Sequence, residues 1–303
     1  MISIILIILT SLFFPGIIIR IKSIASGRKG PGIFQPWKNI FLLLRKGSVF
    51  SNVSSYISQI APVIYISTIL CVMLLIPFPG KTPVFGFDAD FILFAYLLGL
   101  GKFFFIISAM DSGSSFQGMG ANREALYSML VEPAFFILIG SLALLTGHIS
   151  LQELFSESCS TDNYIFIIYI IVIYLLAQIC MIENSRMPVD DPKTHLELTM
   201  IHEVMVLDYS GFDLALINIG TYLKFAIYGS LIANCIIPAH WLIIYQILAF
   251  FIIQVVFAGL IGFLESFRAR KKIVKNPQFI VTLSSIALIV FILCVLLINH
   301  VIK

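Results

Sequence analysis

Eight stretches of this chain are long and apolar enough to cross a lipid bilayer as helices. We place them at residues 2–19, 56–76, 91–109, 126–146, 165–181, 212–236, 241–264 and 279–298. A helix needs about 20 apolar residues to cross a bilayer, whereas a membrane-spanning strand alternates over about 10 residues. The mean hydropathy of the chain is +1.03, and no such alternation occurs. The sequence therefore predicts an all-α polytopic membrane protein with about eight transmembrane helices.

Lysine and arginine residues set the predicted orientation of these helices. Fifteen of the nineteen lie in the loops after the first, third, fifth and seventh spans, whereas only Lys81 and Lys303 lie on the opposite side. Because loops rich in lysine and arginine stay in the cytoplasm, both termini are expected to face outward. The net charge of +3 follows from these loops and needs no nucleic-acid partner.

Two cytoplasmic segments are long enough to contain short helices of their own, residues 20–55 and 182–211. In the first, Trp37, Ile40, Phe41 and Leu44 recur at helical spacing. This pattern favours a short helix lying in the membrane interface. A basic loop resting on anionic lipid headgroups is an equally good explanation of these residues.

The cysteine and histidine patterns predict no metal site in this chain. The five cysteines are scattered, without the paired spacing that iron–sulfur and zinc sites use. His195 and His202 lie two helical turns apart and do not form the HExxH pattern. We therefore expect neither a bound cofactor nor a catalytic residue here.

Two lysines lie deep within predicted spans. Lys102 lies about 18 Å along its helix from Asp90, and Lys224 lies at a similar depth in the sixth span. A lysine at that depth pairs with an acid, loses its proton or lines water. For Lys102, reaching back to the membrane surface is the alternative.

A third group of charges follows the third span. Asn122 is expected to cap a helix that begins at Arg123, after a loop containing three glycines. Glu124 and Glu132 then fall along one side of that helix, with Glu132 two turns inside the membrane. A carboxyl group at that depth suits proton transfer, whereas an ion pair with Arg123 or Lys102 would merely hold helices together.

Residues 183–211 concentrate charge between two apolar spans. They hold six of the sixteen acids and two of the five histidines: Glu183, Asp190, Asp191, His195, Glu197, His202, Glu203 and Asp208. Pro188 and Pro192 predict a loop over residues 186–192, and the apolar spacing beyond it predicts a short helix to residue 207. On that helix Glu197 and Asp208 share one face, and the two histidines share another. Such a segment is expected to relay protons or to dock a partner protein.

Several motifs resemble the membrane-anchor subunit of group 4 nickel–iron hydrogenases, which is related to the complex I membrane subunit that walls the quinone chamber. The matching stretches are Gly30-Pro-Gly-Ile-Phe-Gln35, Lys102-Phe-Phe-Phe105, Asp111-Ser-Gly-Ser114, Gly120-Ala-Asn-Arg-Glu-Ala-Leu126, Val131-Glu-Pro133, Arg186-Met-Pro-Val-Asp-Asp-Pro-Lys-Thr-His-Leu-Glu-Leu198, Asp208-Tyr-Ser-Gly211 and Glu265-Ser-Phe-Arg-Ala-Arg270. The resembled family includes formate hydrogenlyase subunit 4 and the hydrogenase-4 type. Thr221 precedes Tyr222 where the complex I subunit usually has glutamate, which favours the hydrogenase branch.

The resemblance implies a single complex I subunit 1-like domain over residues 1–303 and a non-catalytic subunit of a hydrogenase or formate hydrogenlyase-like oxidoreductase complex. It implies hydrogenase-like large and small subunits, an iron–sulfur subunit and antiporter-like membrane subunits as partners. Iron–sulfur clusters and a nickel–iron centre are expected in those partners, and the complex in a bacterial or archaeal cytoplasmic (inner) membrane. Two alternatives stay open: a quinone-site subunit of an NADH:quinone oxidoreductase-like complex, and a stand-alone ion transporter.

In the leading interpretation, the chain couples redox chemistry in the docked arm to movement of protons or sodium. The residues predicted for the proton path are Lys102, Glu124, Glu132, Glu183, Glu197, Glu203, Asp208 and Lys224. The residues predicted for partner docking are Arg186, Asp190, Asp191, His195, His202, Arg268 and Arg270.

Overall fold

The computed structural model describes every residue except 52, 156–162, 191–200, 268–272 and 300–303. Its long helices are α1 (Ile2–Ala25), α3 (Tyr56–Leu75), α4 (Asp90–Asp111), α5 (Ser115–Thr146), α7 (Asn163–Glu183), α9 (Gly211–Ile236), α10 (Ile243–Phe267) and α11 (Asn276–Ile298). The short ones are α2 (Gln35–Leu44), α6 (Leu151–Leu154), α8 (His202–Met205) and the 3₁₀ turn η1 (Ile273–Lys275). Within the described residues, eight helices are long and apolar enough to cross a membrane. The predicted all-α polytopic fold is confirmed, and the outward orientation of the termini stays a prediction.

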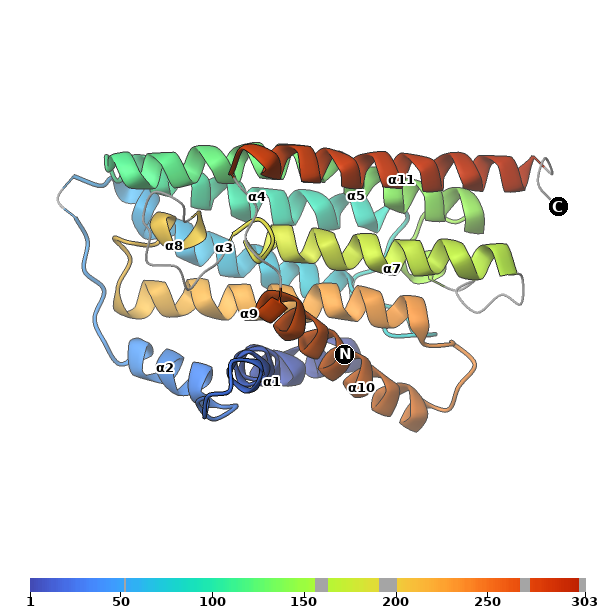
Figure 1. Cartoon of the computed structure of the whole chain (residues 1–303), viewed down its shortest axis with the longest axis horizontal. Coiled ribbons are helices and arrows are strands. Elements are labelled where there is room, and N and C mark those ends of the chain that lie inside the picture. The colour runs from blue at the N-terminus through green and yellow to red at the C-terminus, as the bar shows by residue number, and fades with distance from the viewer. Residues whose placement is uncertain (52, 156–162, 191–200, 268–272, 300–303) are drawn as a thin grey trace.

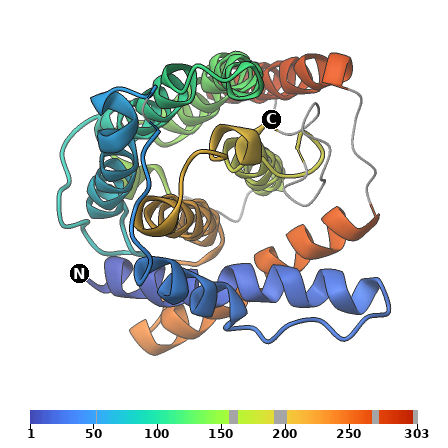
Figure 2. The same cartoon turned by 90° about the vertical axis from the view of Figure 1, so that its left-hand side faces the viewer.

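Helix α9 occupies the centre of the bundle and contacts α1, α2, α3, α7 and α10. Most long helices run along the long axis of the molecule, whereas α1 and α10 cross it steeply and pack against each other (Figures 1 and 2). Helix α9 is buried on nearly all sides, although it is the least apolar of the eight long helices. Because charged groups at membrane depth are costly beside lipid, a helix that contains Asp213 and Lys224 is expected to lie inside the bundle.

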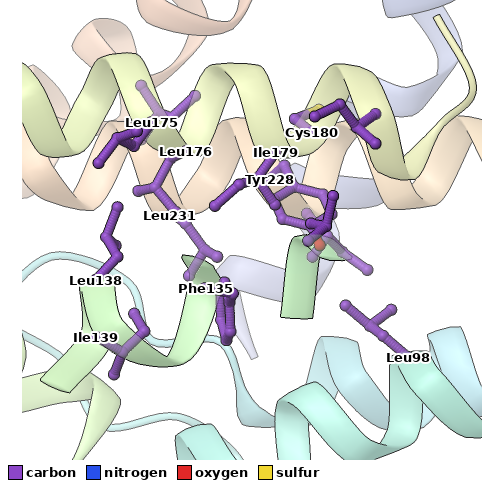
Figure 3. Packing of buried hydrophobic residues seen from close by; sticks show 14 of the residues in the cluster. Leu98, Phe135, Leu138, Ile139, Leu175, Leu176, Ile179, Cys180, Tyr228 and Leu231 are labelled. Carbon is purple, nitrogen blue, oxygen red and sulfur yellow. The ribbon is translucent and has the colours of Figure 1, made fainter. Parts of the chain in front are cut away.

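The main buried core includes close side-chain packing between α5, α7 and α9. Leu138 of α5, Leu176 of α7 and Leu231 of α9 have no exposed surface, and Figure 3 shows them in this packed region. Lipid tails are as apolar as leucine, so exclusion of water adds little to association of these helices within a membrane. Van der Waals packing and buried polar contacts hold the helices together instead.

The predicted short helix after the first span is confirmed as α2, and its position in the membrane interface stays a prediction. Its Ile40 is buried, whereas Phe41 on the other side is 60% exposed. The indole Nε1 of Trp37 donates a hydrogen bond to the Ser11 carbonyl at 3.2 Å, which ties α2 to α1. Beyond α2 the chain crosses the start of α9, where a side chain at Gly211 would collide with the chain before Val49.

The predicted start of the fourth long helix was wrong. Helix α5 begins at Ser115, so Asn122 and Arg123 lie inside it instead of at its first turn. The glycines suggested a loop, but Gly120 serves a different purpose. A Cβ built on Gly120 would lie 2.9 Å from the Ile201 carbonyl oxygen, so its absence lets the chain entering α8 pack directly on α5.

The predicted helix before residue 207 is short where it is described. Helix α8 spans His202–Met205, and the chain then turns through residues 206–208, so Asp208 lies outside it. Val206 is buried in a cluster with α4 and α9, and the Tyr209 hydroxyl donates to the Ser58 carbonyl at 3.0 Å. These two contacts pull the chain away from the helical path. Residues 191–200, where the helix was expected to begin, lie outside the described residues.

Candidate functional site

Four charged side chains meet inside the bundle, and each comes from a different helix. Lys102 Nζ of α4 lies 2.8 Å from Glu124 Oε1 of α5 and 3.1 Å from Glu183 Oε1 of α7. Lys224 Nζ of α9 lies 2.8 Å from Glu183 Oε2. The order Glu124–Lys102–Glu183–Lys224 therefore alternates in sign along the row. We call these four residues the charge chain.

The charge chain is buried and formally neutral. Lys224 is 2% exposed, and the four residues together contribute two acids and two bases. Further hydrogen bonds satisfy the remaining polar atoms, because Lys224 Nζ donates to the Glu183 carbonyl at 2.9 Å and Ser185 Oγ donates to Glu124 Oε2 at 3.2 Å. Buried ion pairs contribute little net stability compared with apolar residues of similar size. Their presence at this depth is thus better explained by function.

A cavity of about 430 Å³ borders the charge chain on one side. Lys102 and Glu183 contribute to its wall, and the rest is mainly apolar, including Leu98, Phe135 and Tyr228 (Figure 3). Glu132 of α5 also lines it, and this residue is exposed on the outer surface of the bundle. The cavity therefore leads from the charge chain to a carboxylate at the edge of the molecule.

Glu132 forms no ion pair with any residue that the structure describes. The predicted alternative, in which Glu132 forms an ion pair with Lys102 or Arg123, is wrong. Lys102 forms its ion pairs with Glu124 and Glu183 instead. An exposed carboxylate in the middle of a membrane helix is costly beside lipid. The exposed position of Glu132 therefore favours contact with a polar surface of a neighbouring protein over contact with lipid.

A second buried cluster is centred on Glu265 of α10. Its carboxylate accepts from Lys22 Nζ of α1 at 2.8 Å and from Arg186 Nη1 at 3.4 Å, and its side chain has no exposed surface. The Arg186 guanidinium also lies over the Phe225 ring of α9, 5.1 Å from its centroid. This cluster fixes the crossing of α1 and α10 to the chain that leaves α7.

The turn after α7 connects the two clusters. Glu183 belongs to the charge chain, Ser185 bonds to Glu124, and Arg186 reaches Glu265. Ser185 has φ +48°, in the left-handed region that residues with side chains seldom adopt. Tertiary contacts on both sides hold it there, so a movement of this turn would alter both clusters.

The other predicted residues have varied positions. Asp190 is buried and its Oδ2 accepts from the backbone nitrogens of Ile201 at 3.0 Å and His202 at 3.2 Å. The His202 ring packs on Phe105, and burial lowers its pKa to about 4 against the opposing effect of Glu124. Glu203 and Asp208 are exposed. The predicted site residues outside the described part of the chain are Asp191, His195, Glu197, Arg268 and Arg270.

Comparison with known proteins places this arrangement in a family. A family model described as NADH dehydrogenase matches residues 1–297. The chain belongs to this NADH dehydrogenase family. Among its relatives, hydrogenase-4 component C of Escherichia coli K12 is 31% identical over 78% of this chain and 73% of that protein. Formate hydrogenlyase subunit 4 of the same organism is 26% identical over 70% of this chain and 68% of that protein.

More distant family members are also similar to the chain. An NADH-quinone oxidoreductase subunit of Bordetella pertussis is 24% identical over 63% of this chain and 56% of that protein. In a solved structure of the membrane-bound sulfane sulfur reductase, an archaeal respiratory membrane complex, one chain matches with a TM-score of 0.82, covering 96% of each chain. Its sequence identity is 18%, so this match supports the family fold alone.

Three buried polar residues of this family member were missed at the sequence level. Glu265 organises the second cluster, and Asp90 accepts the Leu151 backbone nitrogen at 2.7 Å where α4 begins. Asp213 is buried in the first turn of α9 without an ion pair among the described residues. An acid in the first or last turn of an apolar span was the available signal, but it does not distinguish buried from solvated helix ends.

Proposed function

We propose that this chain is the membrane subunit of a hydrogenase or formate hydrogenlyase-like complex, in which it anchors a cytoplasmic redox arm and couples that arm to ion movement. The observation that carries the proposal is the buried charge chain beside a cavity that reaches an exposed carboxylate. The hydrogenase relatives are more similar in sequence than the quinone oxidoreductase relative, which favours this complex over a quinone-site subunit.

The proposed ion path begins at the turn after α7 and ends at Glu132. Ser185 and Glu124 form its inner end, Lys102 and Glu183 face the cavity, and Glu132 lies at the outer edge. Water in a cavity of this size would bridge the gap between Glu183 and Glu132, because polar groups at both ends give it hydrogen-bond partners. A proton taken up at one carboxylate weakens its hold on the adjacent lysine, so the effect passes along the row.

Coupling would depend on the turn at residues 184–190. This turn contacts Glu124 through Ser185 and Glu265 through Arg186, and Asn276 Nδ2 donates to the Val189 carbonyl at 2.9 Å. A redox step in the docked arm that shifts the turn would alter the hydrogen bond between Ser185 and Glu124, at the inner end of the charge chain. The exposed acids Glu203 and Asp208 are proposed to supply protons to it.

The partners proposed for this subunit are hydrogenase-like large and small subunits, an iron–sulfur subunit and antiporter-like membrane subunits, in the cytoplasmic (inner) membrane of a bacterium or archaeon. The exposed Glu132 is proposed to face a polar residue of such a membrane neighbour. The iron–sulfur clusters and the nickel–iron centre would belong to the partners. The proposed docking residues Asp191, His195, Arg268 and Arg270 would contact the arm.

The proposal is tested with the whole complex, isolated through a tag on this chain and reconstituted into vesicles. We expect hydrogenase-like subunits with nickel and iron to co-purify. We also expect redox turnover to acidify the vesicle lumen or to accumulate sodium in it. Glu132→Gln and Glu183→Gln should lower the ions moved per electron pair, measured on the complex that assembles and turns over. Collapse of the gradient by a protonophore or by a sodium ionophore identifies the ion.

The control is Asp88→Asn, which removes an exposed acid near the start of α4, away from the charge chain. It should leave the ions moved per electron pair unchanged. Full coupling in both Glu132→Gln and Glu183→Gln would refute the path. If the tagged chain purifies without any redox subunit, the anchoring role is refuted.

A further inference from the structure

A small polar cavity lies where α4 ends and α5 begins, separate from the charge chain. Its volume is about 20 Å³, and its polar wall is formed by Ser51, Ser54, Ser58, Ser108, Ser112, Gln117, Asp208 and Tyr209. A single water needs about 10–15 Å³ on this measure, so the space fits one small particle. It has no room for a lysine or arginine side chain of another protein.

Gln117 is the residue in this wall that most needs a partner. It is 1% exposed, and its Oε1 has no hydrogen-bond partner among the described residues. A buried amide oxygen left unpaired is costly, and native proteins nearly always satisfy it. Since Gln117 lines the cavity, the occupant of the cavity is the available partner.

The serine hydroxyls offer lone pairs to the cavity and few protons. Ser58, Ser108 and Ser112 each donate their hydroxyl proton to the carbonyl three residues earlier, at 2.8–2.9 Å. Tyr209 donates its own to the Ser58 carbonyl at 3.0 Å. The wall is therefore rich in acceptors, which favours a cation over an anion.

Negative charge surrounds the same place. Asp111, Asp208 and Asp213 form no ion pair with any residue that the structure describes. Burial raises the pKa of Tyr209 to about 12, a hydrogen bond with Ser108 opposes the shift, and these three carboxylates add to it. A neutral water would satisfy Gln117, whereas a cation would also offset the charge of Asp208, which lines the cavity.

We propose that this cavity binds one dehydrated sodium ion, held by the Gln117 amide oxygen and the serine hydroxyls, with Asp208 as the charged ligand. A divalent ion is disfavoured because calcium and magnesium prefer several carboxylates or retained waters, for which this wall has neither ligands nor room. The ion would join the start of α3, the end of α4, the start of α5 and the turn before α9. This site contains no residue of the charge chain and shares only Asp208 with the proton supply proposed above.

The test uses the purified full-length chain in lipid nanodiscs. Binding of radioactive sodium is measured at constant ionic strength with choline as the replacement cation, and unfolding temperature is followed in parallel. We expect one displaceable sodium per chain and a higher unfolding temperature in sodium than in choline. Gln117→Leu should weaken binding about tenfold, and the isosteric Gln117→Glu should tighten it by a similar factor.

The matched control is Gln178→Leu. Gln178 is also a buried glutamine with an unpaired amide oxygen, but it lies in α7 and does not line this cavity. It should bind sodium like the native chain. Should Gln117→Leu fail to fold, Gln117→Glu decides the question through its tighter binding. The absence of sodium binding by the native chain, or unchanged binding in both Gln117 variants, would overturn the proposal in favour of a bound water.

Discussion

Replacing Glu183 by glutamine removes the acid that Lys102 and Lys224 share. In Glu183→Gln, Lys102 keeps Glu124 as its partner at 2.8 Å, whereas Lys224 keeps only the residue-183 carbonyl at 2.9 Å. The charge chain then carries one uncompensated positive charge at a side chain that is 2% exposed. Breaking a buried ion pair from one side costs about 3–5 kcal/mol, so we expect a loss of that size in the free energy of unfolding.

A second substitution tests whether charge balance is the cause. In the double variant Glu183→Gln with Lys224→Met, the Glu124–Lys102 pair remains and the site is neutral again. Replacing a whole buried ion pair with uncharged residues is often neutral for stability. The double variant should therefore recover most of the loss, although it carries one more mutation than the single variant.

Buried cysteines provide the assay. Cys180, Cys235 and Cys294 are buried in the native fold, so a thiol-reactive fluorophore reports their exposure as the detergent-solubilised chain is heated, above the signal of Cys71, which is exposed and reacts before heating. Glu132→Gln serves as the control, since its exposed carboxylate has no ion pair among the described residues and should change stability by about 0.5 kcal/mol or less. If the double variant unfolds no later than Glu183→Gln, charge balance does not stabilise this site.

Three further predictions concern the surrounding structure. Glu265→Gln leaves two partly buried cations without an acid and should cost up to about 3–5 kcal/mol in the same thermal assay. An unchanged unfolding temperature would refute a stabilising role of the second cluster. Gly120→Ala should cost about 1–3 kcal/mol by pushing α8 from α5, whereas Gly118→Ala, which faces open space, should not destabilise the fold. Burial lowers the pKa of His202 to about 4 from 6.5 in the unfolded chain, so the folded ring stays neutral where the unfolded ring binds a proton. Its contribution to stability should therefore be lost as pH falls from 6.5 toward 4. Calorimetry should show that the free energy of unfolding of His202→Phe falls less steeply over this pH range than that of the native chain.

Local sequence was a good guide to the long helices because each span carries its own signal. About 20 apolar residues in succession have few other solutions in a membrane, so the eight spans were predicted within a few residues at most boundaries. The start of α5 was the main exception. Gly118 and Gly120 have low helix propensity, and only the packing of α8 on Gly120 explains why the helix continues through them.

The candidate site could be predicted only in part. Lys102, Lys224, Glu124 and Glu183 stood out because charge within apolar spans is costly, and that cost is visible in the sequence. Which acid pairs with which lysine was not visible, since the partners lie on four different helices. Glu265 looked like an ordinary polar residue at a helix end until the crossing of α1 and α10 buried it.

The sequence by itself determined that this chain spans a membrane with eight helices and keeps costly charges within them, because both properties follow from local composition and its free energy in lipid. Only the tertiary structure decided how those charges combine. Ion pairs form over about 3 Å, and helix packing alone brings residues from α4, α5, α7 and α9 to that distance while leaving Glu132 at the outer edge.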